Sequence, residues 1–269
     1  MINAEARSDR GCPDSDSYQE IALLIRALAR PGRMLYAVAM ACFGSHYLTF
    51  MVTGSSAPPG PPWYPEQTWL SWAAGASLLG AALAMLFEGR VRWVALMLGT
   101  GLFLRVAIVH IPPIAVSVPT PEAWTSAAGV MSLAGGAFCI ATTLADIPDI
   151  PPRLAQWIFA VPLFVVGAQH FVYAHFIADF IPDWIPGHLF WAYFLGMAFF
   201  ASALAIMCRV SAVPASALLG LIFLLWVLIL HLPRVLAAQH NGNEWTSMFV
   251  ALGMAGSSWA VTGSLGKRN

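Results

Sequence analysis

The sequence predicts an all-α integral membrane protein with eight transmembrane helices, arranged as two parallel four-helix repeats with both termini in the cytoplasm. Three observations predict this fold class. Apolar residues make up 59% of the chain and charged residues only 10%, against roughly 25% charged in an ordinary globular protein. Eight windows are long and apolar enough to cross a bilayer. Sequence features also recur at an offset close to half of the chain.

Residues 1–33 are predicted to form a cytoplasmic segment that contains a short amphipathic helix at 17–30. Ser17 and Glu20 have the spacing of a capping box, and apolar residues from Ile21 to Leu28 form one helical stripe. Pro31-Gly32 is expected to end this helix. The helix would lie on the cytoplasmic leaflet, or dock on the bundle or on a partner, and the sequence leaves these alternatives open.

The membrane part is predicted to consist of one repeat at 34–146 and a second at 154–264. A spanning helix needs about twenty mainly apolar residues. The windows that satisfy this requirement are 34–53, 69–87, 93–112, 124–145, 155–175, 188–207, 215–233 and 245–263.

The orientation follows from the basic residues, because Arg and Lys are retained in the cytoplasm. Eleven of the thirteen basic residues precede the first window or follow the second, fourth, sixth or eighth. Both termini are therefore expected in the cytoplasm. Four spans per copy is an even number, so the two copies would share one orientation and form a parallel repeat.

The repeat is visible in particular residues. Trp124 and Trp245 each begin a Trp-Thr-Ser tripeptide and lie 121 residues apart, and His110 and His231 have the same separation. Further upstream the offset is taken as 124, which pairs His46 with His170 and places a three-residue difference in a Pro/Gly/Ser-rich loop. We interpret Trp-Thr-Ser as structural, with an interfacial Trp followed by a polar residue that caps the incoming helix.

Arg105 and Arg234 are the two basic residues that break the orientation rule. An arginine inside a membrane costs at least ~2.5 kcal/mol unless it is paired or hydrated, so such a residue predicts a functional or structural partner. Arg105 lies five residues before His110, and Arg234 lies three residues after His231. We therefore select these four as candidate catalytic residues, although Arg234 is close enough to the interface to reach water.

All seven histidines fall in the outer half of the predicted topology, among aromatic and acidic residues. Three kinds of site use such a set: haem ligation, a quinone head-group site, or a transition-metal site. Each competes with simple packing and with the aromatic belt of membrane proteins. The candidate cofactor-binding residues are His46, His170, Trp184 and Trp191, and no metal ligands are assigned.

Several function classes are excluded by what the sequence lacks. It contains no P-loop, no GxGxxG after a strand, no HExxH and no GxSxG, so nucleotide and soluble-type hydrolase chemistry are not expected. The formal net charge is zero, which offers no field to attract nucleic acid. The four cysteines form no CxxC.

The stretch GAQHFVYAHFIADFIPDWIPGHLFWAYFLGMAFFASALAI, residues 167–206, resembles the DoxX-like membrane proteins. The first copy resembles them through GSHYLTF and PPWYPEQTWLSWAAGASLLGAAL. The resemblance implies four-helix units, a bacterial or archaeal inner membrane and a redox setting, since DoxD-type relatives are subunits of a thiosulfate:quinone oxidoreductase. It supplies no assigned catalytic set. The chain departs from the basic family form by being duplicated and by lacking CxxC.

Three functions follow from these observations. The first is a membrane subunit of a quinone-linked redox system, with a His/Arg site at the outer leaflet and a quinone, or less favoured a haem b, as the bound group. The second is a non-catalytic subunit that anchors or stabilises a larger membrane complex. The third is a small-solute transporter. The absence of Asp and Glu near the middle of the predicted spans argues against this function. The partners expected are the lipid bilayer and other subunits of a membrane redox complex, but not nucleic acid.

Overall fold

The computed structural model describes residues 13–53, 68–85, 91–116, 120–144 and 149–266, and within these ranges every regular element is a helix. Five helical stretches are long and apolar enough to cross a membrane: Val91–His110, Pro121–Thr143, Pro152–Val172, His188–Cys208 and Ala212–Ala237. The chain is therefore a helical protein built for a lipid environment. Its outer faces carry large exposed apolar side chains, such as Met97 and Val172, as expected where the solvent is lipid.

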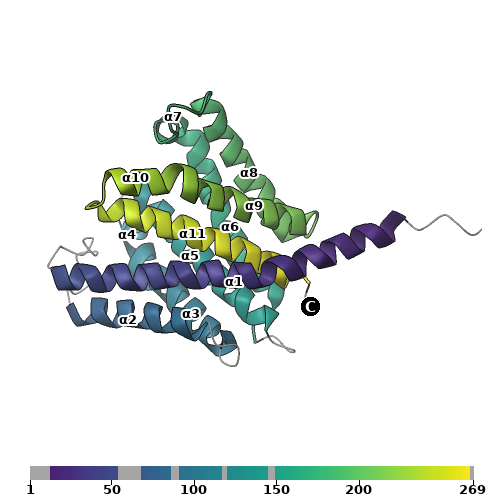
Figure 1. Ribbon diagram of the computed structural model, residues 1–269, viewed down its shortest axis with the longest axis horizontal. Coiled ribbons are helices and arrows are strands. Elements are labelled where there is room, and N and C mark those ends of the chain that lie inside the picture. The colour runs from purple at the N-terminus through teal and green to yellow at the C-terminus, as the bar shows by residue number, and fades with distance from the viewer. Residues whose placement is uncertain (1–12, 54–67, 86–90, 117–119, 145–148, 267–269) are drawn as a thin grey trace, which may run out of the picture.

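Apart from the additional short helix α7, the described elements follow one another in the same order in both copies (Figure 1). The first copy contains α1 (Pro13–Thr53), α2 (Thr68–Ala84), α3 (Val91–Arg105), the π-helical segment η1 (Val106–His110), α4 (Ile111–Val116) and α5 (Pro121–Thr143). The second contains α6 (Pro152–Val172), the short α7 (Ala174–Ala178), α8 (His188–Cys208), α9 (Ala212–Trp226), the π-helical segment η2 (Val227–His231), α10 (Leu232–Ala237) and α11 (Gly242–Ser264).

The first helix is longer than the sequence predicts. α1 runs for 41 residues and contains Pro31, so the expected stop at Pro31-Gly32 is wrong. A proline inside a helix removes one hydrogen bond, which tertiary packing can offset. Here Gly32 packs directly on the backbone of α11, since a Cβ at this position would lie 2.8 Å from the nitrogen of Ala260. The segment predicted as a separate amphipathic helix is thus the beginning of α1, and it projects from the bundle in Figure 1.

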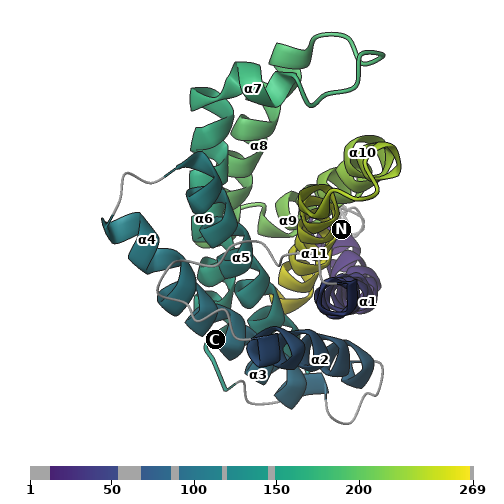
Figure 2. The same ribbon diagram turned by 90° about the vertical axis from the view of Figure 1, so that its left-hand side faces the viewer.

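The two copies do not form two separate four-helix bundles. α1 packs mainly on α2 and α11 and barely touches α5 of its own copy, whereas α6 packs on α8 and α5 and barely touches α11. α5 and α11 lie against each other in the centre (Figures 1 and 2). The first helix of each copy is therefore exchanged onto the last helix of the other copy, which corrects the prediction of two bundles.

Glycines allow these exchanged helices to approach closely. A Cβ at Gly256 on α11 would meet the backbone nitrogen of Tyr36 on α1, and a Cβ at Gly135 on α5 would meet the backbone nitrogen of Phe159 on α6. The two glycines are 121 residues apart, whereas Tyr36 and Phe159 are 123 apart. Helices α1 and α6 are therefore equivalent at an offset of 123, not 124.

This register overturns one predicted equivalence. At an offset of 123, His46 corresponds to Gln169, and Tyr47 corresponds to His170. The sequence pairing of His46 with His170 is wrong by one residue. A one-residue shift turns a side chain by about 100° around a helix, so the two histidines face different neighbours.

Candidate functional site

Each copy contains one π-helical turn at the same place, 121 residues apart. In η1 the N–H of Ile111 donates to the carbonyl of Val106, and in η2 the N–H of Leu232 donates to the carbonyl of Val227, so both bonds span five residues. The cause lies in the next residue, which is Pro112 in one copy and Pro233 in the other. Proline has no N–H to continue the α-helical ladder, and the preceding turn widens.

The two π-helical segments end at His110 and His231. In the described part of the chain, Nε2 of His110 and Nδ1 of His231 are buried and have no hydrogen-bond partner. Most buried polar atoms in folded proteins are paired, and π-helical turns are frequent at functional sites. The two histidines are therefore the strongest candidates for binding something outside the chain.

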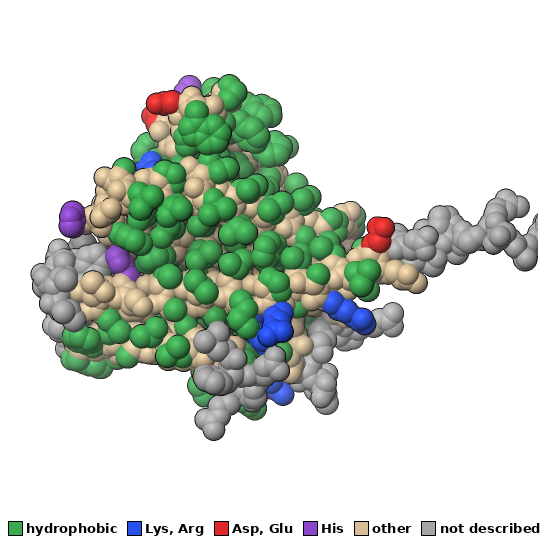
Figure 3. Space-filling view, in the orientation of Figure 1, with side chains coloured by type: hydrophobic (Ala, Val, Ile, Leu, Met, Phe, Trp, Pro, Cys, Tyr) green, Lys and Arg blue, Asp and Glu red, His purple; other side chains and the backbone are tan. Residues whose placement is uncertain are grey.

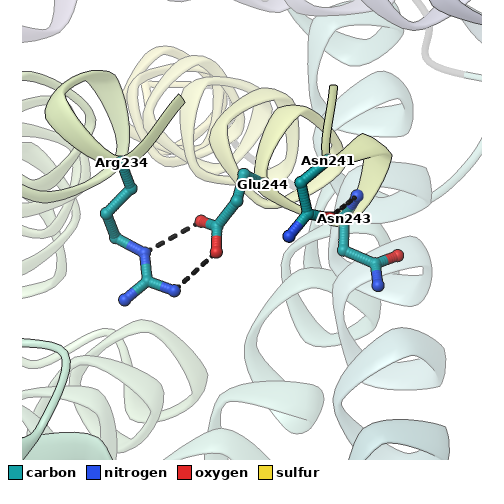
Figure 4. A network of polar contacts seen from close by, with 4 residues as sticks. All are labelled: Arg234, Asn241, Asn243 and Glu244. Carbon is teal, nitrogen blue, oxygen red and sulfur yellow. Dashed lines mark hydrogen bonds and ion pairs between the residues drawn. The ribbon is translucent and has the colours of Figure 1, made fainter. Parts of the chain in front are cut away.

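Arg234 forms an ion pair that the sequence analysis did not predict (Figure 4). Its Nε donates to Oε2 of Glu244 at 2.8 Å and its Nη2 donates to Oε1 at 2.6 Å. The guanidinium carbon also lies 4.4 Å from the ring centre of Phe180, which follows α7. Arg234 thus joins α10, the first turn of α11 and the chain after α7 at one place. Nη1 is not used by the pair and remains a donor.

Arg105 does not play the same part in the first copy. Its Nη2 donates to the hydroxyl of Tyr47 on α1 at 3.3 Å. At the offset of 121, the residue of the second copy that corresponds to Arg105 is Trp226. The residue of the first copy that corresponds to Arg234 is Pro113. The two arginines predicted as one set therefore belong to different positions of the repeat.

His46 lies on α1 and contacts the first turn of α11, the turn that carries Glu244. Its imidazole is hydrogen-bonded to the backbone carbonyl of Gly242, and its ring stands edge-on to Phe249 at 5.7 Å. Gln169 makes the equivalent bond in the other copy, where its Nε2 donates to the carbonyl of Pro121 at 2.8 Å. The matching bonds support the offset of 123.

His170 has a packing role in this structure. One ring nitrogen, Nδ1, is bonded to the carbonyl of Val166 at 2.8 Å, and the ring contacts Phe199 edge-on at 5.0 Å. These contacts are local to α6 and α8. His170 therefore does not reproduce the surroundings of His46.

Trp184 and Trp191 lie on the connection that leads into α8 and on its first turn. The Trp184 side chain is 71% exposed, and the indole of Trp191 donates to the carbonyl of Pro186 at 3.2 Å. Across the described ranges, no hydrogen bond or ring contact joins either indole to a histidine. Exposure of this kind is typical of the interfacial belt.

The Trp-Thr-Ser tripeptide does not cap the helices it begins. The N-caps are Thr120 and Asn241, again 121 residues apart, whose side chains accept hydrogen bonds from the backbone nitrogens of Ala123 and Asn243. The hydroxyls of Thr125 and Thr246 instead donate to the carbonyls four residues earlier. The predicted capping role was therefore assigned to the wrong residue.

Within the residues that the structure describes, no three His, Cys, Asp or Glu side chains are close enough to hold a metal ion. Comparison with protein-family models, curated proteins and solved structures finds no match to this chain. What the geometry offers is one corner, at the start of α11, that gathers His231, the Arg234–Glu244 pair and His46. We call this set the α11 corner.

Proposed function

We propose that the chain crosses the membrane eight times with both termini in the cytoplasm. The five long apolar helices are joined in the bundle by α1, α2 and α11, which cover the other three predicted windows. Figure 3 supports one orientation, because most basic side chains visible on this face lie at the lower centre and right of centre, whereas the visible histidines lie toward the left and the top. The resemblance to DoxX-like proteins makes a bacterial or archaeal inner membrane part of the same proposal.

We further propose that the α11 corner binds the head group of a quinone in a membrane redox system. The observation that carries this proposal is the buried, unpartnered Nδ1 of His231, at the end of a π-helical turn and one helical turn before Arg234. A quinone carbonyl oxygen is a hydrogen-bond acceptor of the kind that a protonated ring nitrogen requires. When bound, a quinone accepts two electrons and two protons, and the electrons would come from a donor on a partner protein.

Each residue of the α11 corner has a separate role in the proposed site. His231 donates a hydrogen bond to the ligand and holds a proton at its ring nitrogen. Arg234 keeps its Nη1 donors outside the pair with Glu244, and Glu244 fixes the guanidinium through two short hydrogen bonds. His46 reaches the corner from the exchanged helix α1 and is held by the Gly242 carbonyl.

The equivalent corner of the other copy has lost this set. At the corresponding offsets, Pro113 replaces Arg234, Ala123 replaces Glu244 and Gln169 replaces His46, so His110 alone is retained. The proposal therefore narrows the predicted site to one of two related places. It leaves His110 and Arg105 outside the quinone site, with Arg105 bound to Tyr47.

Binding of a short-chain ubiquinone and a short-chain menaquinone to the detergent-solubilised protein tests this proposal. We expect His231→Leu to weaken binding about tenfold or more, since a hydrogen bond at a charged or desolvated site has that worth. The matched variant His110→Leu removes the pseudo-equivalent imidazole and should bind as the wild type does. Equal effects of the two variants, or wild-type binding by His231→Leu, would contradict the assignment.

A reduced-minus-oxidised absorption spectrum of the same preparation separates quinone from haem. No absorption in the Soret region is expected. A sharp Soret band with an α-band would replace the quinone by haem b and make the histidines candidate axial ligands.

The alternative, a non-catalytic subunit of a larger complex, is favoured by one specific observation. The N-terminal part of α1 projects beyond the bundle (Figure 1) with most of its side chains exposed, including Leu23 at 65%. Replacing Leu23 by Ser and measuring co-purification with native membrane partners tests this alternative. A partner that is lost in Leu23→Ser but retained in His231→Leu would identify α1 as a docking helix.

A further inference from the structure

Two arginines that form no ion pair with any described residue lie at the end of the second copy that is opposite to the α11 corner. Arg153 lies in the first turn of α6, and Arg209 follows directly after α8. Arg209 Nη2 donates to Oε1 of Gln156 at 3.3 Å, and Gln156 is one helical turn beyond Arg153, which puts the two arginines at the same end of α6. Among the described residues, neither arginine forms an ion pair, and Nε of Arg209 is buried without an acceptor.

The buried Gln156 makes this arrangement rigid. Its side chain is 1% exposed, and its Nε2 donates to Oγ of Ser264 at 3.0 Å while its Oε1 accepts from Arg209. Partial burial and the positive charge of Arg153 both lower the pKa of the Arg209 guanidinium. Two cations held at short range repel each other, and an anion between them removes that repulsion.

The backbone between Arg209 and the start of α9 also offers hydrogen-bond donors to an anion. Arg209 and Ser211 have φ values of 57° and 52°, a left-handed conformation that is uncommon for residues other than glycine and often occurs at functional sites. The side chain of Ser211, the N-cap of α9, makes no capping hydrogen bond. The N–H groups of Ala212 and Val213 therefore donate no hydrogen bond to that side chain and can meet an anion. Pro214 has no N–H, and Ala215 donates to the carbonyl of Ser211.

An apolar groove lies along α6, and its lining includes Leu154, the residue after Arg153, and Trp157, one helical turn beyond Arg153. Its volume is about 260 Å³, and its lining residues are Met131, Leu154, Trp157, Ile158, Val161 and Pro162. From Leu154 to Pro162 the helix rises by about 12 Å, which is the length of a substantial part of an acyl chain. The lining residues of the groove are therefore all apolar, and they begin within one helical turn of Arg153.

We propose that this place binds an anionic phospholipid, with its phosphate between Arg153 and Arg209 and one acyl chain in the groove. The positive charge of the arginine pair selects an anionic head group, and the apolar groove within one helical turn of Arg153 favours a lipid over a free phosphate. The site belongs to the second copy alone. At the offset of 123, Leu154 and Trp157 are replaced by Pro31 and Met34 in the first copy.

Native mass spectrometry of the full chain, titrated with phosphatidylglycerol and with phosphatidylcholine, tests the proposal. We expect Arg209→Gln and Arg153→Gln each to reduce phosphatidylglycerol binding about fivefold to tenfold, because each removes charge-assisted hydrogen bonds. Phosphatidylcholine binding should not change in these variants. Arg30→Gln is the matched control, since Arg30 occupies the place of Arg153 in the first copy, and it should bind as the wild type does.

Two further variants test whether the bound molecule is a lipid or a free anion, and whether a loss of binding comes from lost recognition or from misfolding. Trp157→Ala removes apolar surface that would contact the acyl chain and should weaken phosphatidylglycerol binding. Inorganic phosphate at millimolar concentration should not compete with phosphatidylglycerol. The double variant with both arginines replaced by lysine keeps the charge and should retain most of the binding. Wild-type phosphatidylglycerol binding by Arg209→Gln, or an equal loss with Arg30→Gln, would overturn the proposal. The proposal does not rest on quinone binding, and His231→Leu should leave it unchanged.

Discussion

The exchange of helices between copies predicts a specific steric sensitivity at Gly256, where α11 crosses α1. A Cβ at this position would meet the backbone nitrogen of Tyr36, and it would lie 2.8 Å from Tyr36 Cα and 2.9 Å from the carbonyl oxygen of Gly32. Ordinary van der Waals contact begins at 3.4 Å. Gly256→Ala must therefore push α1 and α11 apart by at least about 0.6 Å, since the obstructing atoms are backbone and cannot rotate away.

Two opposing contributions set the size of the effect. Overpacking of this kind costs about 1–3 kcal/mol, and a helix–helix gap of 0.5–1 Å loses a quarter to a half of the dispersion attraction along the interface. Replacing Gly by Ala inside a helix returns up to about 1 kcal/mol. The steric cost exceeds the gain, so we expect a net loss of about 1–2 kcal/mol in the free energy of unfolding.

Unfolding in a detergent micelle by SDS titration, followed by circular dichroism, measures this difference. Gly80→Ala is the matched control, because Gly80 lies on α2 with no atom within 4 Å of an added Cβ and should be unchanged or slightly stabilised. Gly135→Ala, at the equivalent crossing of α5 and α6, should lose as much as Gly256→Ala. Stability of Gly256→Ala equal to the wild type, or a matching loss in Gly80→Ala, would refute the exchanged packing.

Three other predictions follow from contacts described above. Tyr36→Phe should lower the free energy of unfolding by about 1 kcal/mol, because the buried hydroxyl donates to the carbonyl of Leu133 at 2.8 Å, and the same SDS titration measures it. Asp149 accepts from Arg92 at 2.6 and 2.7 Å, which lowers the pKa of the carboxyl; its stabilising contribution is present above the usual value of about 4 and is lost as the pH falls through the lowered value. The difference in Tm between wild type and Asp149→Asn should accordingly shrink between pH 6 and pH 3. Pro31→Ala should raise Tm, since α1 continues through this residue and gains a hydrogen bond; a lower Tm would mean that the proline is required there.

Much of the helical content could be predicted from the sequence, because apolar windows of about twenty residues and the positions of Pro and Gly act locally. The repeat could also be predicted, and His110 with His231 does occupy equivalent π-helical turns. The cause of those turns was present in the sequence as His-Ile-Pro and His-Leu-Pro. The missing N–H of each proline is the feature of the sequence that indicates a π-helical turn before it.

The other features depended on contacts between distant residues. Matching His46 to His170 relied on residue type, whereas the true register is set by the glycine crossings and by the hydrogen bonds of His46 and Gln169. The sequence does not identify Glu244 as the partner of Arg234, because only the fold brings its carboxylate to that guanidinium. The exchange of α1 and α6 cannot be predicted from the sequences of these helices, since an apolar helix face does not specify which neighbouring helix will cover it.

The exchange has a consequence for how the protein is made. Helix α1 is synthesised first, yet its main partner α11 is synthesised last, with roughly 190 residues between the end of one and the start of the other. At about 5–20 residues per second, α1 waits on the order of 10–40 s in the bilayer before the ribosome has delivered that partner. During this interval its small-residue face is covered by lipid, by α2 or by an assembly factor. A chain stopped after α5 would leave α1 without α11 and α5 without α6, so the ribosome must finish the second half before either half can reach its final packing.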